Sequence, residues 1–190
     1  MAGIIPADKL KAIMDICTAY EDSDALELAG RLMEDPAIRM HGPEHHFLTA
    51  AAILTAYANK YCPKSKYRFL KMASHRTVRI PVAVCAIYGT CGALMGAGTA
   101  VSIIIQANPF AAETLQIVNK ATASIQNELS GYNEIRCCKR SAWASVKGAL
   151  GVLNTCEGIS MPVSDICCHH SFKHNACIGK RCPYCHCADA

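Results

Sequence analysis

The residues with the most evident chemistry lie at the C-terminal end, in ICCHHSFKHNACIGKRCPYCHCADA. This stretch holds six cysteines and four histidines within residues 166–190. Thiolate sulfur is the ligand preferred by zinc, cuprous copper and iron–sulfur clusters. Gly179 and Pro183 permit the tight turns that wrap several thiolates around one centre. The segment is therefore expected to bind a metal ion or a cluster.

The spacing within this segment separates three cysteines from the rest. Cys168, Cys177 and Cys182 follow one another at nine and five positions, and Pro183 comes directly after the last. A cysteine followed by proline is typical of iron–sulfur loops, where the proline turns the chain away from the cluster. The pair Cys182-x-x-Cys185 has zinc-knuckle spacing, but the sequence has no second pair at a zinc-ribbon distance. We predict these three cysteines as ligands of an iron–sulfur cluster, with zinc as the alternative.

A second candidate is RCCKR, residues 136–140. Adjacent cysteines bridge each other only with strain, so Cys137 and Cys138 are expected to face different surroundings. The neighbouring cations, and a helix dipole if a helix starts here, would lower a thiol pKa and favour the thiolate. Either cysteine could fill a fourth ligand position, or that position stays open. Lys139 and Arg140 are predicted to hold an anionic substrate.

A third candidate is HGPEHH, residues 41–46. His41-x-x-Glu44-His45 formally matches an inverted zinc-protease pattern, but Gly42 and Pro43 prevent the continuous helix that those proteases need. We expect His41 in a loop and the residues Glu44, His45 and His46 in a first helical turn. There they would act as acid/base groups or as ligands near a buried centre. The alternative is that the histidines only satisfy hydrogen bonds at a helix start.

A fourth candidate is GTCGALMGAG, residues 89–98. Small residues let backbones or a cofactor approach closely, so Cys91, Gly96 and Gly98 are candidate cofactor-binding residues. The spacing is not G-x-G-x-x-G and does not predict a dinucleotide site. Close helix packing without a ligand is the alternative, and we favour it.

The elements that must position these residues all show helical spacing of apolar side chains. We expect an all-α bundle around a glycine-rich central helix within residues 80–112, with an irregular cysteine-rich C-terminal segment folded onto it. The predicted boundaries are a helical domain at 1–160 and a cysteine/histidine-rich segment at 161–190. The outer helices are expected at 7–20, 23–34, 44–61, 64–79, 110–129 and 138–154.

Composition bears on compartment and partners. The uncharged stretch 80–112 is long enough for a membrane span, but Pro81 and several glycines interrupt it, which favours a soluble bundle. Thirteen cysteines without an export signal favour metal ligation over a disulfide framework, and hence a cytoplasmic protein. A mild net charge of +4 with scattered basic residues gives no support for general nucleic-acid binding.

Taken in order, the motifs HGPEHH, CGALMGAG and RCCKR and the C-terminal pattern resemble an uncharacterised family of cysteine-rich prokaryotic proteins. This domain of unknown function is frequent in anaerobes and occurs alone or beside a methyltransferase-like domain. The resemblance covers residues 38–184 and implies a soluble intracellular protein. The family pattern falls on Cys168, Ser171, Cys177, Cys182 and Pro183, and Cys185, His186 and Cys187 lie beyond it.

The function expected from these residues is that of a [4Fe-4S]-type iron–sulfur protein. An open iron would act as a Lewis acid, and sulfur transfer, desulfuration or a lyase reaction on a small anionic or sulfur-containing substrate would follow. The alternative is a zinc-stabilised, non-catalytic accessory module for a methyltransferase or a redox partner. Thiol redox sensing through Cys137 and Cys138 is a third, minor reading.

Overall fold

The computed structural model describes residues 5–171 and 173–185, and this part of the chain contains helices and no strand. The predicted all-α class is confirmed, and the helices match the predicted ranges closely. The α-helices are α1 (Ala7–Ala19), α2 (Ala25–Glu34), α3 (Glu44–Tyr61), α4 (Lys66–Thr77), α5 (Val84–Ile87), α6 (Gly92–Ile104), α7 (Ala112–Ser130) and α8 (Cys138–Leu153), and two 3-10 turns are η1 (Pro63–Ser65) and η2 (Gly179–Arg181).

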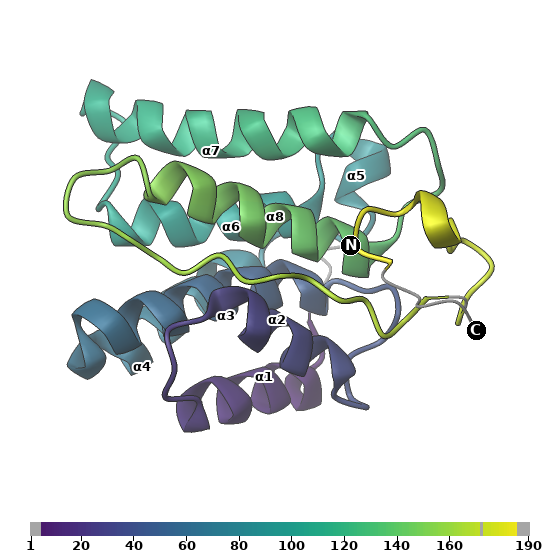
Figure 1. Ribbon diagram of the computed structural model, residues 1–190. Coiled ribbons are helices and arrows are strands. Elements are labelled where there is room, and N and C mark those ends of the chain that lie inside the picture. Colours follow the sequence, from purple (N-terminus) through teal and green to yellow (C-terminus); the bar gives the residue numbers. More distant parts are fainter. Residues whose placement is uncertain (1–4, 172, 186–190) are drawn as a thin grey trace.

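The helices form two layers, with α1 to α4 in one and α6, α7 and α8 in the other (Figure 1). The alanine-rich α3 is buried along nearly its whole length and contacts α1, α2, α4, α6 and α8. Its largest contact is with the glycine-rich α6. The predicted central glycine-rich helix is therefore present, and it shares the centre of the molecule with α3.

Close approach explains the glycines of α6. A Cβ atom added at Gly96 would lie 2.0 Å from the carbonyl oxygen of His46, and one at Gly92 would lie 2.1 Å from His46 Nε2. The Oγ1 of Thr49 crosses the same interface and donates a hydrogen bond of 2.9 Å to the Ala93 carbonyl. Only glycine lets the two backbones approach to this distance.

The uncharged stretch 80–112 is divided between α5 and α6, and the backbone turns through the left-handed conformation at Ala83 and at Gln106. Each resulting helix is short. Across the described residues, no helix combines the length and the apolar character that a membrane span requires.

The C-terminal segment after α8 is held against the bundle by polar side chains. Asn154 exchanges two hydrogen bonds with the Met161 backbone, and Tyr61 accepts one from the Ser160 N–H. Ser164 then donates to Asp24, whose carboxylate caps the start of α2. The segment thus crosses the molecule and reaches the end where α8 begins (Figure 1). A domain boundary at residue 160 stays a prediction.

Candidate metal centre

One small cavity collects four cysteines from two distant parts of the chain. Cys168, Cys177 and Cys182 of the C-terminal segment line it, and Cys137 lines it from the position directly before α8. Cys177 and Cys182 flank the turn η2, which folds this loop back toward the helix start. The three cysteines that sequence spacing set apart therefore share one cavity, and Cys137 joins them.

The three cysteines of the C-terminal segment share a backbone arrangement. The N–H of Gly179 donates to Cys177 Sγ at 3.4 Å. The backbone of His170 makes the same kind of hydrogen bond to Cys168, and the backbone of Tyr184 makes it to Cys182. In each case the donor lies two residues after the cysteine. Peptide N–H groups aimed at sulfur favour its thiolate form, which is the metal-binding form.

Burial has the opposite effect on the thiol pKa values, because it favours the neutral thiol over the charged thiolate. It raises the pKa of Cys168, and the neighbouring Cys137 and Cys182 raise it further. It likewise raises the pKa of Cys182, with a further contribution from Cys137. Several thiolates in one buried cavity repel one another, and a bound metal cation removes that repulsion. The donor set therefore fits a metal-containing group that carries several positive charges.

Histidines complete the wall of this cavity. His170 and His174 both line it, and His174 Nε2 lies 3.8 Å from Cys137 Sγ. The loop residue His41 packs edge-on against His174, with 5.1 Å between the ring centroids. Burial lowers the pKa of both His41 and His174, and the Nδ1 atom of each is buried without a partner. His41 therefore contacts the lining residue His174 but does not itself line the cavity.

A hydrogen-bonded frame fixes the cysteine loop. The N–H of Cys168 donates to the Tyr184 carbonyl at 2.9 Å. The buried Tyr184 hydroxyl donates to Glu128 of α7 at 2.6 Å, and Tyr132 donates to the same carboxylate at 3.1 Å. Arg181 forms an ion pair with Glu134. The loop is thereby tied to α7 and to the segment that leads into α8.

Within the part of the chain that the structure covers, no three cysteine, histidine, aspartate or glutamate side chains are grouped closely enough to hold a single metal ion. A cluster spaces its thiolates more widely than one ion does, because different irons bind different thiolates.

Cys185 is not among the four cysteines that line the cavity. Its Sγ accepts a hydrogen bond from the Ser171 hydroxyl at 3.3 Å. His186 and Cys187 lie outside the described residues.

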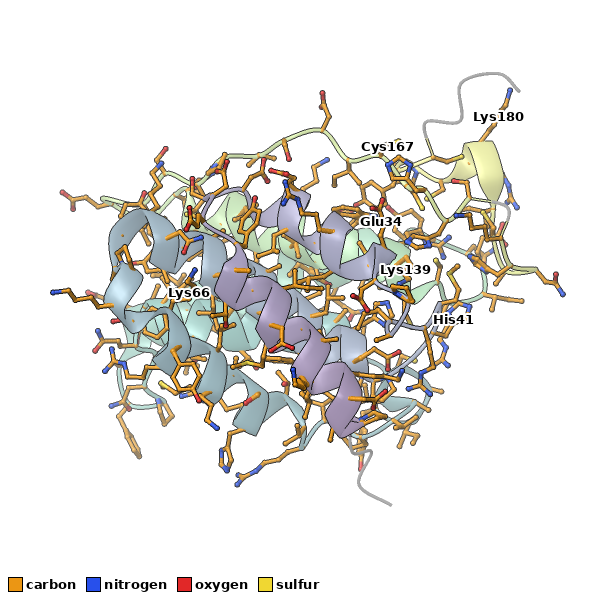
Figure 2. The ribbon with its side chains drawn as sticks, turned by 90° about the horizontal axis from the view of Figure 1, so that it is seen from below. Glu34, His41, Lys66, Lys139, Cys167 and Lys180 are labelled. Atoms are coloured by element: carbon orange, nitrogen blue, oxygen red, sulfur yellow. The ribbon has the colours of Figure 1, made fainter. Side chains whose placement is uncertain are left out.

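The residues of RCCKR diverge from one another. Cys138 lines a second, larger cavity, and burial raises the pKa of its thiol to about 11, so the expected bias toward thiolate is wrong for Cys138. Lys139 is 1% exposed, and its Nζ donates to the Met33 carbonyl at 2.8 Å. Figure 2 labels Lys139 near the end of α2, the helix that contains Met33. The amine expected to hold a substrate therefore joins α8 to α2.

Arg140 occupies a different position from Lys139, because it lines both cavities. Its guanidinium lies 4.7 Å from the ring centroid of Tyr132 and donates to the Ile135 carbonyl at 3.2 Å. Several of its five N–H donors are still available for an anion.

The HGPEHH stretch folds as expected, with His41 in a loop and Glu44 at the start of α3. Glu44 is fully buried and accepts hydrogen bonds from the Arg39 backbone N–H at 3.1 Å, from its Nε at 3.0 Å and from its Nη2 at 2.8 Å. Burial alone would raise the Glu44 pKa, but these bonds outweigh it and hold the pKa at about 2. The carboxylate thus anchors the loop, and His45 lines the second cavity.

The three candidate residues of the glycine-rich stretch also lie in different surroundings. Cys91 lines the second cavity, whereas Gly96 packs on His46 and Gly98 on the Thr122 side chain. Sequence spacing did not single out Tyr184, Glu128 or Cys85. Tyr184 and Glu128 form the frame described above, and Cys85 accepts a hydrogen bond from Arg136 at 3.8 Å. Tyr184 directly follows Pro183, and Cys85 lies close to the glycine-rich stretch, but no motif in the sequence marks Glu128.

Fold and site together define an all-helical protein in which a cysteine-rich C-terminal segment closes a four-thiol cavity against a helix start. The chain belongs to a family of unknown function, DUF5714, whose family model matches residues 13–185. No curated protein and no solved structure matches the chain.

Proposed function

We propose that this protein binds a [4Fe-4S]-type iron–sulfur cluster through Cys137, Cys168, Cys177 and Cys182. The observation that carries the proposal is the common arrangement at the three C-terminal cysteines. Each of their sulfurs has a backbone hydrogen bond from the residue two positions on, and all three line one cavity with Cys137. Hydrogen bonds to cysteine sulfur are one of the means by which proteins tune such clusters.

A cluster with four cysteine ligands supplies one-electron transfer or structural support when it is bound. Cys137 offers the fourth thiol, so we place redox or structural chemistry ahead of the sulfur-transfer or lyase chemistry of an open iron. The residues around the cavity have separable tasks in this proposal. Tyr184 and Glu128 hold the loop, and His174 shields Cys137 from solvent.

Anaerobic purification followed by iron, sulfide and zinc analysis, with a visible absorption spectrum, tests the proposal. We expect roughly four irons and four sulfides per chain, and a brown protein that bleaches on reduction. A colourless protein with about one zinc per chain would contradict the cluster and favour the zinc-stabilised accessory module. An apoprotein that takes up neither metal on anaerobic reconstitution would contradict both.

A further inference from the structure

A second cavity, of about 230 Å³, lies beside the four-thiol cavity and is lined by residues from the starts of α3, α6 and α8 and from the end of α7. Sites for drug-sized ligands measure roughly 300–1,000 Å³, so this volume suits a smaller molecule, such as an amino acid, better than a nucleotide cofactor. Arg140 lines both cavities, and Cys138 of this wall follows Cys137 of the other.

Two buried histidines belong to the lining, and each has one ring nitrogen without a hydrogen-bond partner. His45 Nδ1 lies 3.1 Å from the Gly42 carbonyl, which can only accept, so the proton of the neutral ring is on Nδ1. His45 Nε2 is then a bare acceptor, and it is buried without a partner. His46 is hydrogen-bonded to the Ile80 backbone, and its Nδ1 is also buried without a partner.

Both rings are neutral near pH 7. Burial lowers the His45 pKa to about 3 and the His46 pKa to about 4. The pair therefore offers two hydrogen-bond acceptors and no positive charge. Buried acceptors are almost always matched by a donor, so this lining suits a ligand that carries N–H or O–H groups.

Cationic side chains flank the same cavity. The exposed Arg136 lines it and donates to Cys85 Sγ, which leaves most of its guanidinium donors for an anion. The buried Arg140 also lines this cavity. The one carboxylate among the lining residues, Glu134, forms an ion pair with Arg181. The cavity therefore combines a cationic edge with neutral acceptors inside.

We infer that this cavity binds a small α-amino acid, with its carboxylate at Arg136 and its ammonium group toward the bare nitrogens of His45 and His46. The thiols of Cys91 and Cys138 give the wall a soft, weakly polar surface that suits a short sulfur-containing side chain. This site goes beyond the cluster and does not require iron to be the metal at the neighbouring centre.

Isothermal titration calorimetry on the anaerobically purified full chain tests the inference with three matched probes. S-methyl-L-cysteine carries both charged groups and no thiol that could attack a cluster. 2-(Methylthio)ethylamine lacks the carboxylate, and 3-(methylthio)propionate lacks the ammonium group. We expect saturable binding of the amino acid and at least roughly tenfold weaker binding of each analogue, because each loses a charge-assisted interaction.

Arg136→Gln locates the carboxylate, and Arg31→Gln on the surface of α2 is its control. The first change should weaken S-methyl-L-cysteine roughly tenfold and leave 2-(methylthio)ethylamine unaffected, and the control should alter neither. Absent binding, or equal affinities for the three probes, would overturn the inference. Iron analysis of the same sample separates the two proposals. Binding without iron would count against the cluster alone, and iron without binding against this site alone.

Discussion

Cys137 and Cys138 are neighbours in the sequence, yet they line two different cavities. The backbone of Cys137 is extended, with φ −124° and ψ 112°, and Cys138 is the first residue of α8. The change from extended to helical conformation turns consecutive side chains in different directions. Cys137 thereby meets His174 and the C-terminal cysteines, and Cys138 meets Gly42 and the second cavity.

This divergence gives the most direct test of the ligand set. Cys137→Ser should lower the iron content and alter the visible spectrum, because serine replaces one of the four thiols that line the cavity. Cys138→Ser should leave both unchanged, since its side chain faces the other cavity. Iron and sulfide analysis of the two variants, purified anaerobically in parallel, measures the difference. Equal iron loss in both variants would show that the two cavities are not independent.

The turn after Cys177 offers a second test. Gly179 has a φ of +54°, and its N–H donates a hydrogen bond to Cys177 Sγ. Gly179→Ala should cost about 1–2 kcal/mol at this position and should weaken iron retention during dialysis against a chelator. Gly158, with a φ of +76°, has open space around it and lies outside the cysteine loop.

Gly158→Ala is therefore a matched control with the same backbone penalty. It should lower stability by a similar amount and leave iron retention as it is in the unmodified protein. Loss of iron from both variants at the same rate would mean that global stability, and not the geometry at Cys177, governs retention.

The sequence anticipated the helices and the grouping of Cys168, Cys177 and Cys182, because both depend on local spacing. It left the choice between Cys137 and Cys138 open, since that choice depends on where α8 docks. Local charge predicted a lowered thiol pKa in RCCKR, but burial, which sequence does not report, raises the pKa of Cys138. Lys139 and Glu44 looked like reactive groups. Their partners, the Met33 carbonyl and Arg39, are set by tertiary structure or by a loop fold that no motif encodes.

The Glu44–Arg39 pair makes stability depend on pH in a defined direction. The Glu44 pKa falls from its ordinary value of 4.5 to about 2 in the folded protein. The stabilising contribution is therefore complete above pH 4.5 and is lost as the pH falls toward 2. Glu44→Gln should reduce the free energy of unfolding by roughly 1–3 kcal/mol at pH 7, and the difference should shrink as acid is added.

Urea unfolding between pH 7 and pH 3 measures this difference. Glu157→Gln, in the exposed turn after α8, is the control and should change stability little at any pH. If the difference in the free energy of unfolding between Glu44→Gln and the unmodified protein stays constant down to pH 3, the negative charge of Glu44 does not contribute to stability.

The contact between α3 and α6 yields a prediction about the fold itself. Gly96→Ala places a methyl group 2.0 Å from the His46 carbonyl oxygen and 2.4 Å from Thr49 Oγ1, so two buried helices must separate. We expect a loss of roughly 1–3 kcal/mol or more in the free energy of unfolding. Gly151 of α8 has no neighbour within 4 Å of an added Cβ, and Gly151→Ala should gain roughly 0.5–1 kcal/mol from helix propensity alone. Both changes replace a helical glycine by alanine, so comparing the thermal unfolding of the two variants isolates the contribution of packing. A Gly96→Ala variant as stable as the unmodified protein would refute the close approach of α3 and α6.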